Sequence, residues 1–275
     1  MLEIPEALTI ARQLEDTVVG RTVVGVQAAF SPHKFAWYYE DPVDYPKTLV
    51  GRVVDAAAAP GGKVEVSAGD AAMLFADGVA LRYWQPSSLP PARHQLLVHF
   101  DDGSALSASV QMYGGLWCFP KGQLDNYYYD VAKSRPSPLS EAFDEAYFAT
   151  LVEDPATQKI SAKALLATEQ RIPGLGNGVL QDILFFAGIH PRRKLASLTP
   201  AERSLLFCAV KDTLAAMVQK GGRDTEKDLF GRSGGYQTVL SSKTHGQPCP
   251  RCGNLIEKAA YLGGSVYFCS QCQPL

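Results

Sequence analysis

The sequence lacks any apolar run near the ~18 residues that a membrane-spanning helix requires. Its first residues also lack the basic segment and apolar core of an export signal. No repeat or low-complexity tract occurs among its 275 residues, of which 46% are hydrophobic. These absences exclude a membrane, fibrous or repeat protein. The composition predicts a cytoplasmic globular protein with no membrane partner and room for more than one core.

The chain also lacks an overall excess of positive charge, since its formal net charge at pH 7 is −2. The charge is unevenly distributed along the sequence. Residues 151–275 contain 15 Lys and Arg against 10 Asp and Glu, whereas residues 1–150 contain 11 against 18. A nucleic-acid-binding surface places cations opposite phosphates, so we expect any such surface in the C-terminal half.

Cysteine is scarce except at the C-terminal end. Four of the six cysteines form two C-x-x-C pairs separated by sixteen residues, namely Cys249, Cys252, Cys269 and Cys272. Four thiolates in two turns can bind one tetrahedral Zn²⁺ and leave no position open for a substrate. The alternative is a set of unligated thiols in a small core. We predict one structural zinc in a ribbon whose hairpin arms lie between the two pairs.

Periodicity and turn residues divide the chain into three parts. Residues 4–19 have helical periodicity, with Pro5 in the first turn. Residues 21–119 contain alternating β-branched and aromatic segments separated by Asp-Gly turns, which predict strands. Residues 140–221 have helical periodicity, and the Pro- and Ser-rich residues 134–143 indicate a hinge. We therefore expect an α+β protein with a β-sandwich domain and leading helix (1–133), a helical domain (134–240) and a zinc ribbon (241–275).

A glycine-rich turn, "IPGLGN", connects two of the expected helices and ends at Asn177. Exposed N–H groups in such a turn can bind a phosphate. The alternative is a plain connector between two helices, with Asn177 capping the second one. Lys163 lies upstream on a helix, and His190 and Pro191 end the next helix.

Three features together resemble the formamidopyrimidine-DNA glycosylase and endonuclease VIII (Fpg/Nei) family over essentially the whole chain. They are the E-x-P-E start, the series "K-x-x-L…PGLGN…DILFFAGIHP", and the ribbon ending in "CSQCQ". The resemblance implies a β-sandwich fronted by a helix, a helical domain with a helix–two-turn–helix, and a zinc finger that grips DNA. It also implies a monomeric DNA-repair enzyme that flips an oxidised base out of damaged duplex DNA and cleaves the strand.

The resemblance implies catalytic roles at the N-terminus. The family's nucleophile is the secondary amine of a proline that is exposed by removal of the initiator methionine. Leu2 occupies that position here, and because Met is removed only before a small residue, we expect Met1 to be retained. The implied catalytic groups are then the primary amine of Met1 together with Glu3, Glu6 and Lys63.

The resemblance also implies that Lys163 and Asn177 bind nucleic acid. Two of the family's cationic positions are changed, however. Gln111, Met112 and Tyr113 replace a stretch that carries arginines, and Gly264 replaces the ribbon's phosphate-binding arginine. Losing two phosphate contacts should weaken binding and reduce the log–log salt slope by about two.

Several of these assignments have simpler alternatives. Glu3 and Glu6 suit the positive end of a helix dipole, and Lys63 and Lys163 suit solvent-facing lysines. His190 suits a helix terminus. Asp182 replaces the glutamate that is usual in the family.

Two functions therefore remain open. The first is a DNA glycosylase or abasic-site lyase with divergent chemistry. The second is a catalytically inactive relative that binds damaged or structured nucleic acid. A protein-binding module that keeps only the fold is a third reading, favoured by the acidic N-terminal half.

Overall fold

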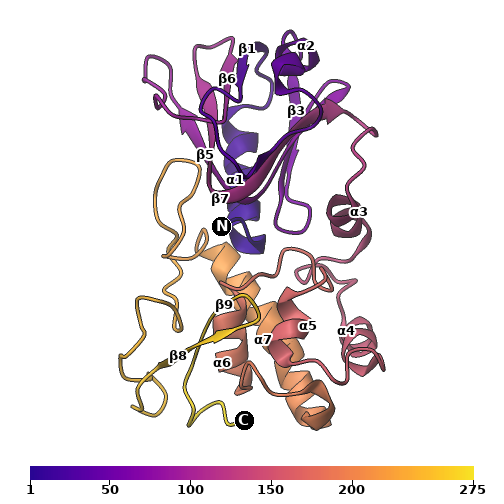
Figure 1. The fold of residues 1–275 in the computed structure, drawn as a ribbon, viewed down its shortest axis with the longest axis vertical. Helices are drawn as coiled ribbons and strands as arrows, with labels where there is room; N and C mark the ends of the chain where they lie inside the picture. The colour runs from indigo at the N-terminus through magenta and orange to yellow at the C-terminus, as the bar shows by residue number, and fades with distance from the viewer. The chain divides into compact units, whose positions relative to one another are not determined.

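The computed structural model describes residues 1–275 and divides the chain into two compact units (Figure 1). The first contains Met1–Tyr127 and Lys220–Gly235, and the second contains Tyr128–Gln219 and Tyr236–Leu275. The segment Lys220–Gly235, which we expected in the helical domain, thus belongs to the β-rich unit. Its backbone joins that unit directly, since the Tyr83 N–H donates to the Leu229 carbonyl over 3.0 Å. The three domain boundaries stay a prediction.

The first unit begins with the predicted helix, α1 (Ile4–Thr17). Pro5 occupies its first turn, where a missing N–H costs no hydrogen bond. Ala7, Ile10 and Leu14 recur at helical spacing and are buried in the core of this unit.

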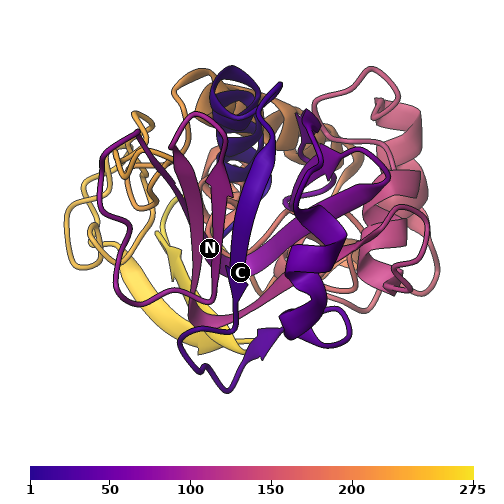
Figure 2. The same ribbon diagram turned by 90° about the horizontal axis from the view of Figure 1, so that it is seen from above.

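Seven strands form one continuous sheet, which Figure 2 shows from above in indigo to magenta. The strand order is β1-β6-β7-β5-β4-β3, and the short β2 pairs with β7. The long strands β5 and β7 pair from Ala71↔Pro120 to Trp84↔Ala105 and connect all strands of the predicted β-sandwich by hydrogen bonds. The bounds are β1 (Val23–Ala28), β2 (Ala36–Trp37), β3 (Val54–Ala58), β4 (Val64–Ala68), β5 (Ala71–Trp84), β6 (Leu96–Phe100) and β7 (Ala105–Pro120), with η1 (Pro42–Asp44) and α2 (Tyr45–Leu49) between β2 and β3.

A bulge interrupts the β5–β7 ladder. Pairing passes from Asp77↔Gly114 to Val79↔Val110, so the segment 111–113 of β7 faces the single residue Gly78. Glycine is required there because an added Cβ would lie 2.7 Å from the Tyr113 carbonyl oxygen. Asp77 adopts a left-handed backbone conformation with φ 62°. The bulge therefore fixes an irregular backbone at this point of the sheet.

The second unit contains helices and a hairpin. Its elements are α3 (Tyr127–Ser134), α4 (Glu145–Glu153), α5 (Ala162–Ala167), α6 (Leu180–Ala187), η2 (Leu195–Ser197), α7 (Pro200–Gln219), β8 (Glu257–Tyr261) and β9 (Gly264–Phe268). Helix α4 is capped by Asp144, whose carboxylate accepts the Tyr147 N–H. Helix α5 is capped in the same way by Ser161. No helix in either unit is both long and apolar enough to cross a membrane.

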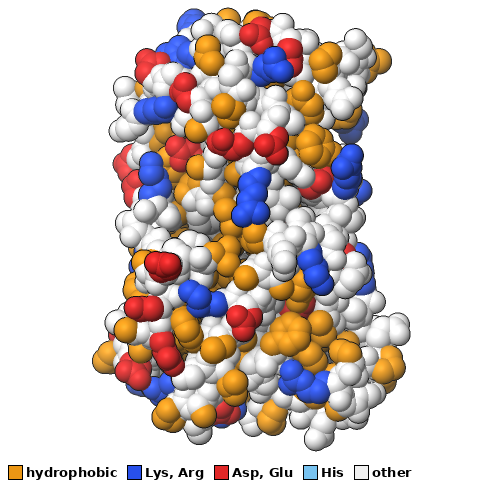
Figure 3. All heavy atoms as spheres, turned by 180° about the vertical axis from the view of Figure 1, so that it is seen from behind, with side chains coloured by type: hydrophobic (Ala, Val, Ile, Leu, Met, Phe, Trp, Pro, Cys, Tyr) orange, Lys and Arg blue, Asp and Glu red, His pale blue; other side chains and the backbone are white.

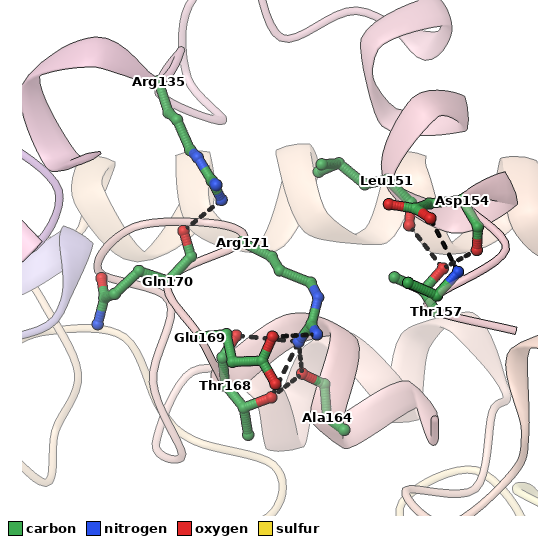
Figure 4. A network of polar contacts seen from close by, with 10 residues as sticks. Arg135, Leu151, Asp154, Thr157, Ala164, Thr168, Glu169, Gln170 and Arg171 are labelled. Carbon is green, nitrogen blue, oxygen red and sulfur yellow. Dashed lines mark hydrogen bonds and ion pairs between the residues drawn. The ribbon is translucent and has the colours of Figure 1, made fainter. Parts of the chain in front are cut away.

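The turn that precedes "IPGLGN" is held by arginines (Figure 4). Glu169 and Gln170 both have positive φ, 57° and 49°. The Arg135 guanidinium donates to the Gln170 carbonyl over 2.7 Å. The Arg171 guanidinium donates to Thr168 over 3.1 Å and pairs with the Glu169 carboxylate over 2.5 Å. These contacts fix two residues that would be strained without support.

Candidate functional site

A pocket of about 430 Å³ lies in the first unit. The start of α1, the part of β5 after the bulge, the bulged residues of β7 and the loop 225–227 form its walls. Its lining residues are Met1, Leu2, Glu6, Ile10, Gly78, Val79, Ala80, Leu81, Arg82, Gln111, Met112, Thr225, Glu226 and Lys227. Two of the predicted catalytic residues, Met1 and Glu6, therefore line one cavity. Its volume lies within the range of small-molecule sites, about 300–1,000 Å³.

The first two residues are fixed on the pocket wall. The Leu2 N–H donates to the Asp77 carbonyl over 2.8 Å, and the Leu2 side chain is buried. The amine of Met1 forms an ion pair with the Glu226 carboxylate over 2.6 Å. The loop 220–235 thus supplies the acceptor for the amine that the sequence analysis singled out.

Glu6 and Glu3 share a buried arginine that the sequence analysis missed. The Arg223 side chain donates to both carboxylate oxygens of Glu6, over 3.0 and 2.8 Å, and its backbone N–H donates to Glu6 over 3.1 Å. The Glu3 carboxylate lies 3.6 Å from the same guanidinium. Burial alone would lower the pKa of Arg223, but the two carboxylates raise it above its usual value.

The sequence around Arg223 gave only a weak indication of its contacts with Glu3 and Glu6. It stands in "GGRDTEKDLFGRSGG", whose glycines allow close backbone packing. At Gly234 an added Cβ would lie 2.2 Å from the backbone of Gly222. A glycine-rich loop with an arginine indicates a compact turn, but not its partner near the start of the chain.

Lys63 is buried, which excludes the alternative of a solvent-facing lysine. It closes the turn after Pro60 and precedes β4, which pairs with β5 just before Asp77. Burial lowers the pKa of Lys63, while the Asp77 carboxylate opposes this shift. Burial likewise raises the pKa of Asp77, and Lys63 opposes that shift. The two side chains therefore interact electrostatically beside the bulge that holds Leu2.

Asn177 and Lys163, predicted to bind nucleic acid, both contact the ribbon hairpin inside the second unit. The Asn177 amide donates to the Ser265 carbonyl over 2.9 Å, and its buried Oδ1 has no hydrogen-bond partner. The buried Lys163 ammonium donates to the Tyr261 carbonyl over 2.6 Å. Neither residue is a freely solvated side chain. Asn177 is also not the helix cap that we considered, because α6 begins after Val179 without a side-chain cap.

The four C-terminal cysteines converge as the spacing predicts. Their Sγ atoms all lie within 4.8 Å of one another. The closest pairs are Cys252–Cys269 at 3.4 Å and Cys249–Cys272 at 3.8 Å. Zn–S bonds of about 2.3 Å in a tetrahedron place sulfurs at such separations. The donor set fits one structural zinc, which holds the segment around the β8–β9 hairpin.

Asp182 and His190 have structural partners. The Asp182 carboxylate accepts the N–H groups of Val239 and Leu240 over 2.9 and 2.7 Å, which anchors that segment to α6. The His190 ring packs edge-on against Phe268 at 4.5 Å. Burial lowers the pKa of His190, which favours its neutral form. Both observations agree with the simpler alternative of a helix-terminal histidine.

On the face shown in Figure 3, blue and red side chains are interspersed, and the blue ones do not gather in one continuous patch. At the bulge, Gln111, Met112 and Tyr113 are all exposed, and the centroid of the Tyr113 ring lies 5.7 Å from that of Trp37. An aromatic pair therefore occupies the position where the resemblance led us to look for cations.

A β-rich unit with a leading helix, a helical unit containing a glycine-rich turn, and a four-cysteine ribbon define a helix–two-turn–helix zinc-ribbon protein. Residues 135–228 match the formamidopyrimidine-DNA glycosylase H2TH domain, and residues 246–275 match the zinc finger found in FPG and IleRS. The formamidopyrimidine-DNA glycosylase of Geobacillus kaustophilus is 32% identical over 279 residues, covering 99% of this chain and all of the relative. That of Symbiobacterium thermophilum is 31% identical and is covered to 90%. The chain belongs to the formamidopyrimidine-DNA glycosylase family.

Solved structures agree with this membership. MutM (Fpg) of Thermus thermophilus matches with a TM-score of 0.81 and 26% identity, covering 98% of both chains. Lactococcus lactis Fpg bound to DNA containing N7-benzyl-Fapy-dG matches with a TM-score of 0.85 and 25% identity, covering 99% of this chain and all of that one. The fold that the resemblance implied is confirmed.

Proposed function

We propose that the protein is a DNA-repair glycosylase that binds damaged DNA and removes an oxidised base in the pocket at the start of α1. The observation that carries the proposal is that Met1, Leu2 and Glu6 line the same cavity of about 430 Å³. The curated relatives are named formamidopyrimidine-DNA glycosylases, and Lactococcus lactis Fpg has been solved with damaged DNA. A flipped nucleotide would enter this pocket.

Within this proposal the carboxylates and amines have different tasks. Base removal needs a nucleophile at C1′ of the sugar and a group that moves protons at the reacting atoms. Glu3 and Glu6, fixed by Arg223, are the acid–base candidates. Met1 and Lys63 are the candidate amines, although Leu2 stands where the family's proline is expected. Retention of the carboxylates and of two amines supports catalysis by divergent residues.

We assign binding of the DNA phosphate backbone to the second unit. Asn177 and Lys163 would contact phosphate or hold the ribbon that does so, and the zinc would keep the ribbon folded. The contacts of both residues with the β8–β9 hairpin support this coupling. The missing cations at 111–113 and Gly264 predict weaker binding than in relatives that carry arginines there.

A second candidate is an inactive relative that binds damaged or structured nucleic acid without cutting it. The ion pair between the Met1 amine and Glu226 favours this reading, because a charged, paired amine is a poor nucleophile. The two candidates differ in a single measurable step, the release of a base.

The test uses the full-length protein on duplexes that carry an oxidised purine, an oxidised pyrimidine or an abasic site. Released base and cleaved strand are quantified for the wild type, for Glu6→Gln and for the exposed control Glu141→Gln. We expect release by the wild type and a loss of about 10²-fold or more in Glu6→Gln alone. Binding without release on every duplex would favour the inactive relative. If the protein neither binds these duplexes nor releases a base from them, both candidates are wrong.

A further inference from the structure

Two cations from separate parts of the chain meet at the tip of the β8–β9 hairpin in the second unit. Tyr261 and Gly264 pair across this tip. The Lys163 ammonium donates to the Tyr261 carbonyl over 2.6 Å and lies 6.0 Å from the centroid of the Tyr261 ring. The Arg192 guanidinium donates to the Ala260 carbonyl over 3.1 Å and lies 5.1 Å from the same centroid. Both positive charges therefore lie beside one aromatic residue of the hairpin.

Neither of these cations forms an ion pair with a carboxylate. The side chains of Lys163 and Arg192 each donate to a backbone carbonyl instead. The residue after Arg192 differs, because the Arg193 guanidinium pairs with the Glu202 carboxylate. Lys163 is 3% exposed, whereas Arg192 is exposed to solvent. Buried charges in proteins are normally paired. The hairpin tip thus carries two positive charges that no ion pair neutralises, which favours binding of an anion there.

Asn177 reaches the same hairpin from the glycine-rich turn. Its amide donates to the Ser265 carbonyl over 2.9 Å, one residue after Gly264. An added Cβ at Gly264 would lie 3.5 Å from the Asn177 side chain. Position 264, where the resemblance implies an arginine, therefore adjoins Asn177 directly and adjoins the two cations through its pairing with Tyr261.

We propose that Arg192 binds the DNA phosphate that an arginine at position 264 would otherwise bind. The inference rests on the proposed function, which supplies damaged duplex DNA as the ligand. Stacking on the Tyr261 ring orients the planar guanidinium. The N–H groups that do not contact Ala260 can then donate to phosphate oxygens. Lys163 is too buried to present its ammonium in the same way, so it fixes the hairpin tip and adds to the positive potential.

The role of Arg192 changes the expected salt dependence of DNA binding. Each phosphate contact contributes about 0.9 to the log–log slope on duplex DNA. Without Arg192, the altered positions 111–113 and 264 would lower the slope by about two relative to relatives that carry both arginines. With Arg192 in contact with a phosphate, the deficit is about one.

The experiment measures the affinity of the full-length protein for a duplex with a tetrahydrofuran abasic analogue, at about 50–200 mM salt. Arg192→Gln should weaken binding about tenfold at the lowest salt and reduce the slope by about 0.9. Arg192→Lys keeps the charge and should keep the slope. Arg12→Gln, the same change at an exposed arginine of α1, controls for net charge and should leave the slope unchanged. An Arg192→Gln slope equal to that of the wild type would overturn the inference.

Gly264→Arg tests whether Arg192 and position 264 serve the same phosphate. The position accommodates a side chain, since an added Cβ would make ordinary van der Waals contact at 3.5 Å. Gly264→Arg should raise the slope by about 0.9 in the Arg192→Gln background. In the wild type it should raise the slope much less, because Arg192 already neutralises that phosphate. Equal increases in both backgrounds would show two separate phosphates and overturn the assignment. Recovery of the slope also shows that loss of binding in Arg192→Gln is not misfolding.

Failure of this inference is distinguishable from failure of the proposed function. Base release is measured separately, on duplexes that carry an oxidised base. If the wild type releases a base but Arg192→Gln leaves the slope unchanged, the role of Arg192 is wrong and the glycosylase proposal stands. If the slopes change as expected but no base is released, the role of Arg192 stands and the inactive relative is favoured. If the wild type does not bind the duplex, both proposals are wrong.

Discussion

Replacing Arg223 by methionine tests whether the buried charge network holds the start of α1 in place. The change removes the guanidinium that contacts Glu6 at 2.8 Å and Glu3 at 3.6 Å and leaves two carboxylates buried. Removing one partner of a buried ion pair costs about 3–5 kcal/mol, because the remaining charge is uncompensated. With a urea m-value of about 2–3 kcal/mol/M, the unfolding midpoint should fall by about 1–2.5 M.

Tryptophan fluorescence isolates the relevant unit. Trp37, Trp84 and Trp117 are the three tryptophans of the chain, and all lie in the first unit. Urea titrations of the wild type, Arg223→Met, Glu6→Gln and the double variant give a thermodynamic cycle. The coupling free energy between Glu6 and Arg223 should be about 1–3 kcal/mol, since the double variant no longer buries an unpaired Glu6. The exposed control is Arg12→Met. An Arg223→Met midpoint equal to that of this control would refute the reasoning.

Three further predictions address the remaining sites. Metal analysis should find one zinc per chain. Cys252→Ser or a chelator should release this zinc and make residues 241–275 susceptible to proteolysis. A ribbon that stays protease-resistant without zinc would contradict this prediction. Asn177→Ala and Lys163→Met should each weaken binding to abasic-site duplex by about 1–2 kcal/mol, roughly 5–30-fold in titrations, with Lys159→Met as the matched lysine control. Leu2→Pro should allow removal of Met1, which intact mass would confirm, and so place a proline amine at position 2. The borohydride-trapped adduct with abasic-site DNA should then increase at least about tenfold. Leu2→Ala is the control for removal of Met1 alone, and an equal amount of adduct in both variants would refute the role of the proline amine.

The sequence predicted the features that depend on neighbouring residues. The cysteine ligands are close along the chain, so spacing alone identified the set that converges within 4.8 Å. The helix from Ile4 was found because apolar residues recur on one face. Both signals are local, and local periodicity or spacing is what a single sequence displays directly.

The features that the sequence did not reveal depend on distant partners. Arg223 contacts Glu6 from 217 positions away, and no periodicity links the two. Lys163 resembled a solvated lysine because its acceptor, the Tyr261 carbonyl, lies 98 positions further on. The contact of the Asp77 carbonyl with the Leu2 N–H was equally hidden. An "ADG" motif predicts an ordinary hairpin turn and not a bulge between two long strands. Tertiary packing decided each of these cases.

The bulge in the β5–β7 ladder has a consequence for which length variants can fold. Three residues of β7 face one residue of β5, an excess of two. Side chains alternate between the faces of a strand with a period of two, so an even excess leaves both halves of β7 in phase. Deleting Met112 alone would leave an excess of one, which keeps both halves in phase only if the remaining extra residue adopts a bulge conformation, as at Val23/Gly25 and Val54/Ala56 in the same sheet. Shortening or lengthening the protrusion by two residues preserves that phase. A change of two residues therefore alters the reach of this protrusion without requiring a new bulge conformation above the core.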